Sequence, residues 1–208
     1  MTALPVMSTS AGDGVEQQLR RAMVADLDAG FAEVVRCHER VVYSVALRLS
    51  NRPADAEDLA AEAFLHAYRA LRGYDDERIR TLRLRPWLLT IVRNAARNAA
   101  RHAARRPGPP PEFEPAEQPA TGPTVEQQVE QNDIRGELGT VLAQLPEGQR
   151  VAVVLRHVAD LPTTEVAEAL GCPDGTAKSH ISRGLQRLRT LLTTERPGVT
   201  LEGRIDDA

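Results

Sequence analysis

The sequence predicts an all-α fold of two small helical domains joined by a proline-rich linker. Apolar residues recur with the 3.6-residue period of amphipathic helices on both sides of the linker, and no segment alternates like a half-buried strand. The linker is marked by PGPPPEFEPAEQPATGP, residues 107–123, which contains seven of the fourteen prolines. Such a composition is typical of an extended, partly stiff connector.

We expect the chain to divide into five parts, and its charge follows the same division. The net charge is +5 over residues 28–106, −6 over 107–138 and +1 over 139–193, so the total of −3 hides two basic blocks around an acidic connector. The parts are a flexible N-terminal extension (1–27), a first domain (28–106), an acidic proline-rich linker (107–137), a second domain (138–193) and a flexible tail (194–208).

The first domain is predicted to contain three main helices. A long amphipathic helix carries apolar residues from Phe31 to Leu49, and NRP at 51–53 interrupts it. Pro53 suits the opening turn of the second helix. A polar loop, RGYDDERIRTLRLR (72–85), should then lead to a third helix that begins near Pro86.

The third helix is predicted to end in a basic stripe, RNAARNAARHAARR (93–106), which contains no acidic residue. Like charges four residues apart weaken a helix by about 0.2–0.5 kcal/mol per pair, so the stripe indicates an anionic partner. Phosphates would suit the arginines, and Asn94 and Asn98 could bond exposed bases. The alternative is a frayed, solvated helix end, because basic runs are weak signals. The stripe arginines are Arg93, Arg97, Arg101 and Arg105.

The second domain has the pattern of a helix-turn-helix. Pro146 separates a short helix from a longer one. Thr163 or Thr164 can cap a short helix that ends at Leu170, and Gly171 suits the left-handed position that follows. A longer helix should then run from about Asp174 to Leu192, which completes the motif.

This last helix has an apolar side and a polar side. Lys178, the only lysine in the chain, lies among short hydroxyl side chains and arginines. Small polar groups allow close approach to the major groove, while Lys and Arg reach base edges and phosphates. A solvated basic face on an ordinary bundle helix is the alternative. The inward seam is Ala177, Ile181, Leu185, Leu188 and Leu192, and the polar side includes Lys178, Ser179, Ser182, Arg183 and Gln186.

Both domains resemble parts of a known family. AEDLAAEAFLHAYRAL and RPWLLTIVRNAARNAAR are similar to region 2 of the sigma-70 family, and LAQLPEGQRVAVVLRHVADLPTTEVAEALGCPDGTAKSHISRGLQRLR is similar to region 4. With both blocks in order and a short linker between them, the chain resembles an extracytoplasmic-function (group IV) sigma factor. The resemblance implies a protein that binds core RNA polymerase and directs promoter recognition, melting and initiation.

The resemblance also implies roles for particular residues. Region 2 would meet the −10 promoter element through Arg93, Asn94, Arg97, Asn98 and Arg101, with a base captured by the loop at 75–85. Region 4 would meet the −35 element through Thr176, Lys178, Ser179, Ser182, Arg183 and Arg187. Asp58, Glu62 and Leu65 would bind the β′ clamp of the polymerase, whereas Asp55 and Glu57 more simply complement the positive end of their helix.

The implied partners are core RNA polymerase (β′ clamp and β flap), promoter DNA and an anti-sigma factor. The sequence shows neither a secretory signal nor an apolar run long enough to span a membrane, so we expect a cytoplasmic protein with no membrane insertion. Three positions depart from the usual pattern. Leu84 stands where Phe is common, and Gly148 and Gly184 lie inside helices, where Gly costs about 1 kcal/mol relative to Ala.

Two other functions remain open at this stage. A sigma-mimic would sequester an anti-sigma factor without touching promoters, but it would not need the basic helices. A simple helix-turn-helix regulator would need only residues 138–192. An enzyme is the weakest reading, because the five histidines form no metal spacing with Cys37 or Cys172 and no phosphate-binding glycine loop occurs. We therefore expect no catalytic residue, no metal and no cofactor.

Overall fold

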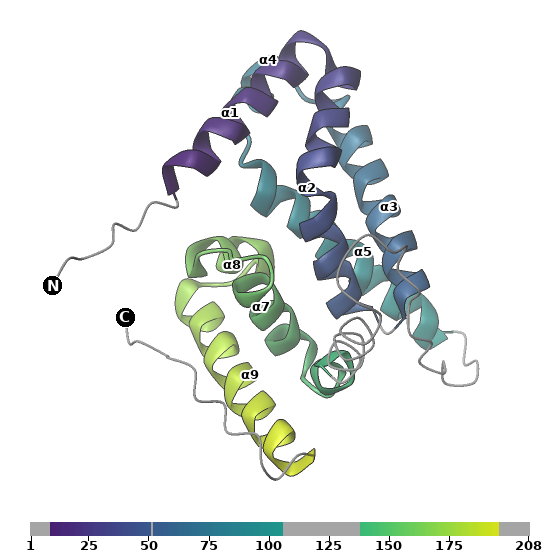
Figure 1. The fold of residues 1–208 in the computed structure, drawn as a ribbon, viewed down its shortest axis with the longest axis vertical. Helices are drawn as coiled ribbons and strands as arrows, with labels where there is room; N and C mark the ends of the chain where they lie inside the picture. Colours follow the sequence, from purple (N-terminus) through teal and green to yellow (C-terminus); the bar gives the residue numbers. More distant parts are fainter. Residues whose placement is uncertain (1–8, 51, 106–137, 196–208) are drawn as a thin grey trace, which may run out of the picture.

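The structure, a computed structural model, describes residues 9–50, 52–105 and 138–195 (Figure 1). These residues form helices and connecting turns without a strand, which confirms the all-α prediction. A helical turn at 138–143 precedes α7. The helices are α1 (Thr9–Ala25), α2 (Leu27–Leu49), α3 (Pro53–Leu71), α4 (Asp76–Thr81), α5 (Leu84–Arg105), α7 (Glu147–His157), α8 (Thr163–Leu170) and α9 (Asp174–Glu195).

The N-terminal unit is a bundle in which α2, α3 and α5 pack on one another. Helix α2 begins at an effective cap, because the Asp26 carboxylate accepts hydrogen bonds from the backbone N–H groups of Asp28 and Ala29, each at 3.0 Å. Helix α3 begins with Pro53, as the sequence predicted. The three helices bury a common apolar seam that includes Val42, Ala63 and Leu89.

Helix α1 corrects the prediction of a flexible extension over residues 1–27, of which 1–8 lie outside the described residues. It packs against α2 and α4 and buries Leu19 and Met23, which are 5% and 2% exposed. Each such burial stabilises the fold by about 1.5–3 kcal/mol. The approach to α2 is close, because a Cβ at Gly30 would lie only 2.4 Å from the backbone N of Met23.

The segment 72–85 was predicted to be a polar loop, but it contains α4. Asp75 caps this helix by accepting from the backbone N–H of Arg78 at 2.8 Å, and Ile79 is buried beneath it. One buried residue in a six-residue helix is too little periodicity for the sequence to reveal. Helix α5 begins at Leu84, two residues before the predicted start at Pro86.

The C-terminal unit has the predicted helix-turn-helix. Gly171 ends α8 in the left-handed conformation, with φ 64° and ψ 40°, as expected. The predicted threonine cap is wrong: Pro162 precedes α8 with extended backbone, Thr163 is already helical, and no side chain caps the helix. A proline has fixed φ and lacks an N–H, so it can stand at the helix entrance without a capping side chain.

The two units pack against each other in this structure (Figure 1). Helix α8 contacts α5, and α7 contacts α2. Their buried side chains join in one cluster that includes Val42 and Leu88 from the first unit and Val154 and Leu155 from the second. The predicted linker at 107–137 and the tail after Glu195 lie outside the described residues.

Candidate nucleic-acid interface

Helix α9 exposes the polar side that the sequence assigned to DNA. Its apolar seam faces inward: Ala177 and Leu188 are buried, and Ile181, Leu185 and Leu192 pack against the core. The hydroxyl of Ser179 donates to the carbonyl of Gly175 at 2.8 Å, and the oxygen of this exposed side chain keeps its capacity to accept a hydrogen bond. All six side chains predicted to meet the −35 element are exposed: Thr176, Lys178, Ser179, Ser182, Arg183 and Arg187.

Two glycines set how closely α9 crosses α7. A Cβ at Gly184 would lie 2.6 Å from Cγ2 of Val153 and 3.2 Å from the carbonyl oxygen of Gln149. On the other side of the same contact, a Cβ at Gly148 would lie 3.2 Å from the His180 ring. Gly148 and Gly184 lower the intrinsic stability of their helices but allow α7 and α9 to pack closely. This close packing fixes the orientation of the exposed side of α9.

The basic stripe on α5 is partly free and partly engaged by the other unit. Asn94, Asn98 and Arg101 are exposed, whereas Arg93 and Arg97 are half-buried. The guanidinium of Arg93 donates to the carbonyl oxygen of Ala169, near the end of α8, at 2.9 Å. Of the stripe arginines, the side chain of Arg105 lies outside the described residues.

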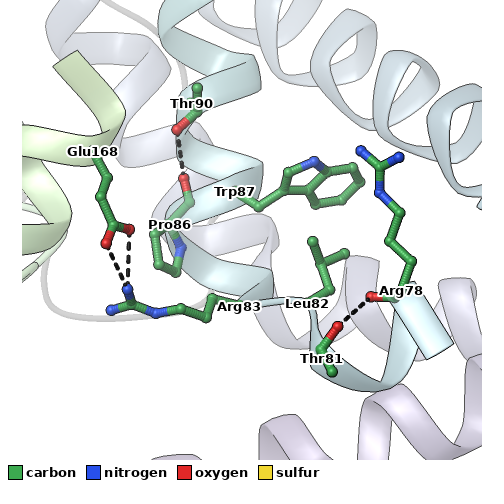
Figure 2. A pocket seen from close by; sticks show the side chains of 8 residues that line it. All are labelled: Arg78, Thr81, Leu82, Arg83, Pro86, Trp87, Thr90 and Glu168. Atoms are coloured by element: carbon green, nitrogen blue, oxygen red, sulfur yellow. Dashed lines mark hydrogen bonds and ion pairs between the residues drawn. The ribbon is translucent and has the colours of Figure 1, made fainter. Parts of the chain in front are cut away.

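A cavity of about 290 Å³ lies between α8 and residues 78–90, which comprise the end of α4 and the first turns of α5 and are called the α4–α5 segment below. Figure 2 shows Trp87 along one wall and Arg83, paired with Glu168 of α8, at another. Trp87 also packs against the cluster shared by the two units and against a second apolar cluster that includes Leu19, Met23 and Ile79, and its ring centroid lies 6.1 Å from that of Tyr74. The cavity combines an indole face with hydrogen-bonding groups, so it could hold a flat polar molecule.

The residues predicted to bind polymerase lie together on the outer face of α3. Asp58, Glu62 and Leu65 are all exposed, and Leu65 is unusual among large apolar side chains in being 46% exposed. An exposed apolar side chain one turn beyond two carboxylates suits a partner that is basic and partly apolar. Asp55 differs, since its carboxylate is held by Arg52 at 2.8 and 3.0 Å in the first turn of α3.

Within the described parts of the chain, the groups with a shifted pKa are spread over several helices and form no reactive centre. Burial lowers the pKa of His38, whose ring lies 2.9 Å from the carbonyl of Val34, and burial also lowers the pKa of His157. A hydrogen bond to Asp28 raises the pKa of Tyr68. Over the described ranges, no three His, Cys, Asp or Glu side chains are grouped so that they could hold a metal ion. None of the helices described is both long and apolar enough to cross a membrane.

Sequence reasoning missed the contacts that surround the α4–α5 segment. Arg83 pairs with Glu165 and Glu168 of α8, and the Arg85 side chain donates to the carbonyl of Ala159. On the other side, Glu16 and Arg20 of α1 bond to this segment. The four-residue spacing of Glu16 and Arg20 was the one available signal, but it indicates only a local helical pair.

Family models match both units. The model for sigma-70 region 2 matches residues 34–106, and the model for sigma-70 region 4 matches residues 135–188. The chain is 27% identical over 185 residues to the ECF RNA polymerase sigma factor SigW of Bacillus subtilis, covering 86% of this chain and 96% of that protein. It is 35% identical over 159 residues to the RNA polymerase sigma-E factor of Streptomyces coelicolor, covering 76% and 84%.

Solved structures share the fold. The sigma factor RpoE from Bartonella quintana, in complex with the anti-sigma factor NepR, superposes with a TM-score of 0.59 at 26% identity, covering 80% of this chain and 98% of that one. CnrH, in complex with the cytosolic domain of CnrY, gives a TM-score of 0.65 at 19% identity over 87% and 99% of the two chains, which shows the fold alone.

Proposed function

The chain belongs to the sigma-70 family as an extracytoplasmic-function sigma factor, and we propose which of its surfaces carry out that function. As a sigma factor it binds core RNA polymerase and directs promoter recognition, melting and initiation. The observation that carries the assignment of surfaces is the exposed polar side of α9, oriented by close packing on α7.

Helix α9 meets the −35 element. Near the middle of the exposed side, Lys178 and Arg183 are long enough to reach base edges in the major groove, while Ser179 and Ser182 allow the helix to approach. Thr176 and Arg187 lie nearer the two ends of the exposed side, where the phosphate backbones would pass. Phosphate contacts set the position of the protein on DNA, and base contacts set its sequence preference. Mutating Thr176 or Arg187 should therefore weaken binding to all sequences, whereas mutating Lys178 or Arg183 should change sequence preference.

Helix α5 and the wall of the cavity that the N-terminal unit supplies, which includes Trp87 and remains when Glu168 of α8 moves away, meet the −10 element. Arg97 and Arg101 neutralise phosphates, and Asn94 and Asn98 bond bases of the opened strand. An unpaired base placed against Trp87 would be stacked on the indole and bonded by the surrounding polar groups. Such capture offsets the few kcal/mol that unpairing a base costs, which favours melting.

The exposed acidic face of α3 binds polymerase. Asp58 and Glu62 would pair with basic side chains of the β′ clamp, with Leu65 packed between the two surfaces. The C-terminal unit would contact the β flap. The polymerase carries out the chemistry, so for this role the chain needs neither a catalytic residue nor a cofactor. It would act in the cytoplasm, where core polymerase is found.

The compact arrangement is the resting form, and the two units separate when the protein engages promoter DNA. This is supported by the contacts of Arg83 and Arg93, which would otherwise face nucleic acid but here bond to α8. An anti-sigma factor is a fitting partner for such a form, because the similar RpoE structure holds NepR.

Transcription from purified components tests the function. Core polymerase with this protein should start transcripts at a small set of sites that core alone does not use. A chain that binds an anti-sigma factor but yields no such starts would be a sigma-mimic. Tight binding of an operator by the protein without polymerase would instead indicate a simple helix-turn-helix regulator.

A further inference from the structure

Two side chains of α1 hold the backbone of the segment that joins α4 to α5. The guanidinium of Arg20 donates to the carbonyl oxygen of Leu82 at 3.0 Å and to the carboxylate of Glu16 at 3.1 Å. The second oxygen of Glu16 accepts from the backbone N–H of Arg85 at 3.2 Å. The side chains of Arg20 and Glu16 are only 20% and 24% exposed, so water can replace these bonds only in part.

Apolar contacts place α1 where it can make these bonds. Leu19 and Met23 share a buried cluster with Ile79 of α4 and Leu84 at the start of α5. Gly30 of α2 lets the backbone of α1 approach closely. Helix α1 therefore packs on the α4–α5 segment beside Ile79 and Leu84, and Arg20 and Glu16 bond to its backbone at Leu82 and Arg85.

We propose that Glu16 and Arg20 are positioning residues for promoter recognition, because they fix the backbone at Leu82 and Arg85, and Leu82 and Arg83 line the cavity beside Trp87. This inference rests on the proposed function of the cavity as the site of an unpaired −10 base. A site discriminates between bases only when its walls and bonding groups are held in place before the base arrives. Helix α1 ends before residue 34, where the match to region 2 begins, so the inference adds an element to the promoter-binding unit.

Three substitutions on α1 separate positioning from general stability. Arg20→Met removes the donors and keeps a long, helix-compatible side chain. Arg20→Lys keeps a donor and should restore part of the function. Arg21→Met is the matched control, because Arg21 is the next residue of the same helix and is exposed. If R20M does not fold, Glu16→Gln, which keeps the shape but replaces one acceptor oxygen by a donor, is measured in its place.

The first measurement reports the segment without polymerase. Trp87 is the only tryptophan of the chain and lines the cavity together with Leu82. In R20M, acrylamide should quench its fluorescence more strongly than in the wild type, while R21M should match the wild type and R20K should fall between. Equal quenching in R20M and the wild type would overturn the inference.

The second measurement reports promoter discrimination. Transcription with core polymerase is measured on a promoter mapped with the wild-type protein and on versions that carry each other base at single −10 positions. R20M should lower the preference for the correct base about tenfold, which corresponds to 1.4 kcal/mol, and leave the −35 preference unchanged. A folded R20M that keeps full −10 discrimination would overturn the inference. If the wild type starts no transcripts, the proposed function fails instead, and the quenching result still decides whether α1 holds the segment.

Discussion

Arg83 and Glu168 face each other across the boundary between the two units: Nη1 of Arg83 lies 3.0 Å from each carboxylate oxygen of Glu168 (Figure 2). Arg83 also pairs with Glu165, one turn earlier on α8. Carboxylates of the C-terminal unit thus pair with an arginine beside the cavity proposed to take a −10 base. In the bound state phosphate oxygens would replace them, because Arg bonds both groups with the same geometry.

Removing the two carboxylates should open the compact form. Arg83 is 52% exposed and Glu168 60%, so that ion pair is strongly screened by solvent, whereas Glu165 is only 17% exposed and its pair is screened less. We expect the two pairs together to contribute about 1–2 kcal/mol, or roughly a fivefold to thirtyfold shift toward the open form. The variant with Glu165→Gln and Glu168→Gln should show a larger radius of gyration by small-angle X-ray scattering at low salt. The wild type should expand toward the same value as salt rises. An unchanged radius in both experiments would show that these pairs do not hold the units together.

Alanine at Gly184 should destabilise the second unit although alanine favours helices. The new methyl would meet Val153, whose branched side chain has little freedom to move, so the overpacking should cost about 1–3 kcal/mol. Gly175→Ala is the matched control, because a Cβ at Gly175 has nothing within 4 Å. That change should leave stability equal or raise it by up to about 1 kcal/mol. Urea unfolding measures both, and a G184A protein as stable as G175A would contradict the close crossing of α7 and α9.

Neutralising the acidic face of α3 should weaken polymerase binding. Asp58→Asn together with Glu62→Gln removes two charges from an exposed surface, and we expect about a tenfold loss of affinity for core polymerase. Glu57→Gln is the control, since Glu57 is exposed on the same helix next to Asp58. The affinities of the wild type, E57Q and the double variant are measured by the fluorescence anisotropy of labelled protein titrated with core polymerase. Equal losses in E57Q and the double variant would mean that net charge, not this face, sets the affinity.

Shortening the long side chains of α9 should change −35 specificity. Lys178→Ala or Arg183→Ala should cost about 1–3 kcal/mol on the preferred −35 sequence if the side chain bonds a base edge. On DNA whose −35 element has been replaced, each variant should bind like the wild type. Arg187→Ala should instead weaken binding to both DNAs alike, as expected of a phosphate contact. Competition binding with both DNAs separates these patterns, and a uniform loss for K178A and R183A would remove them from base recognition.

The sequence predicted the elements that have strong periodicity and clear punctuation. The long helices, the left-handed Gly171 and the inward seam of α9 follow from local rules, and the structure bears them out. Helix α1 escaped because its opening residues, TSAGDG, have low helix preference, and its burial depends on Gly30 in another helix. Gly184 is a second example. Its low helix propensity suggests that it destabilises α9, but the structure shows that it allows α9 to pack closely on Val153 of α7.

The candidate site was predictable only as sets of residues on single helices. Periodicity placed Asn94, Asn98 and the six residues of α9 on exposed faces, since each set lies on one helix. It could not indicate that Arg83 meets Glu168, because that pair forms between units joined by a proline-rich segment. The cavity beside Trp87 is lined by residues of α4, α5 and their connection, with Glu168 of α8 at one side, so no single periodic pattern in the sequence describes it.

The most direct test maps transcript 5′ ends made by core polymerase with the wild type or with the variant carrying Arg97→Gln and Arg101→Gln. We predict discrete new starts with the wild type and the loss of most of them with the variant. For promoter binding, the slope of log K against log salt concentration should also become shallower by about 0.9 for each phosphate contact that the variant lacks. Arg40→Gln, an exposed arginine on α2, should leave the starts unchanged. Starts that are identical in position and yield with both arginines of α5 neutralised would contradict promoter recognition by this helix.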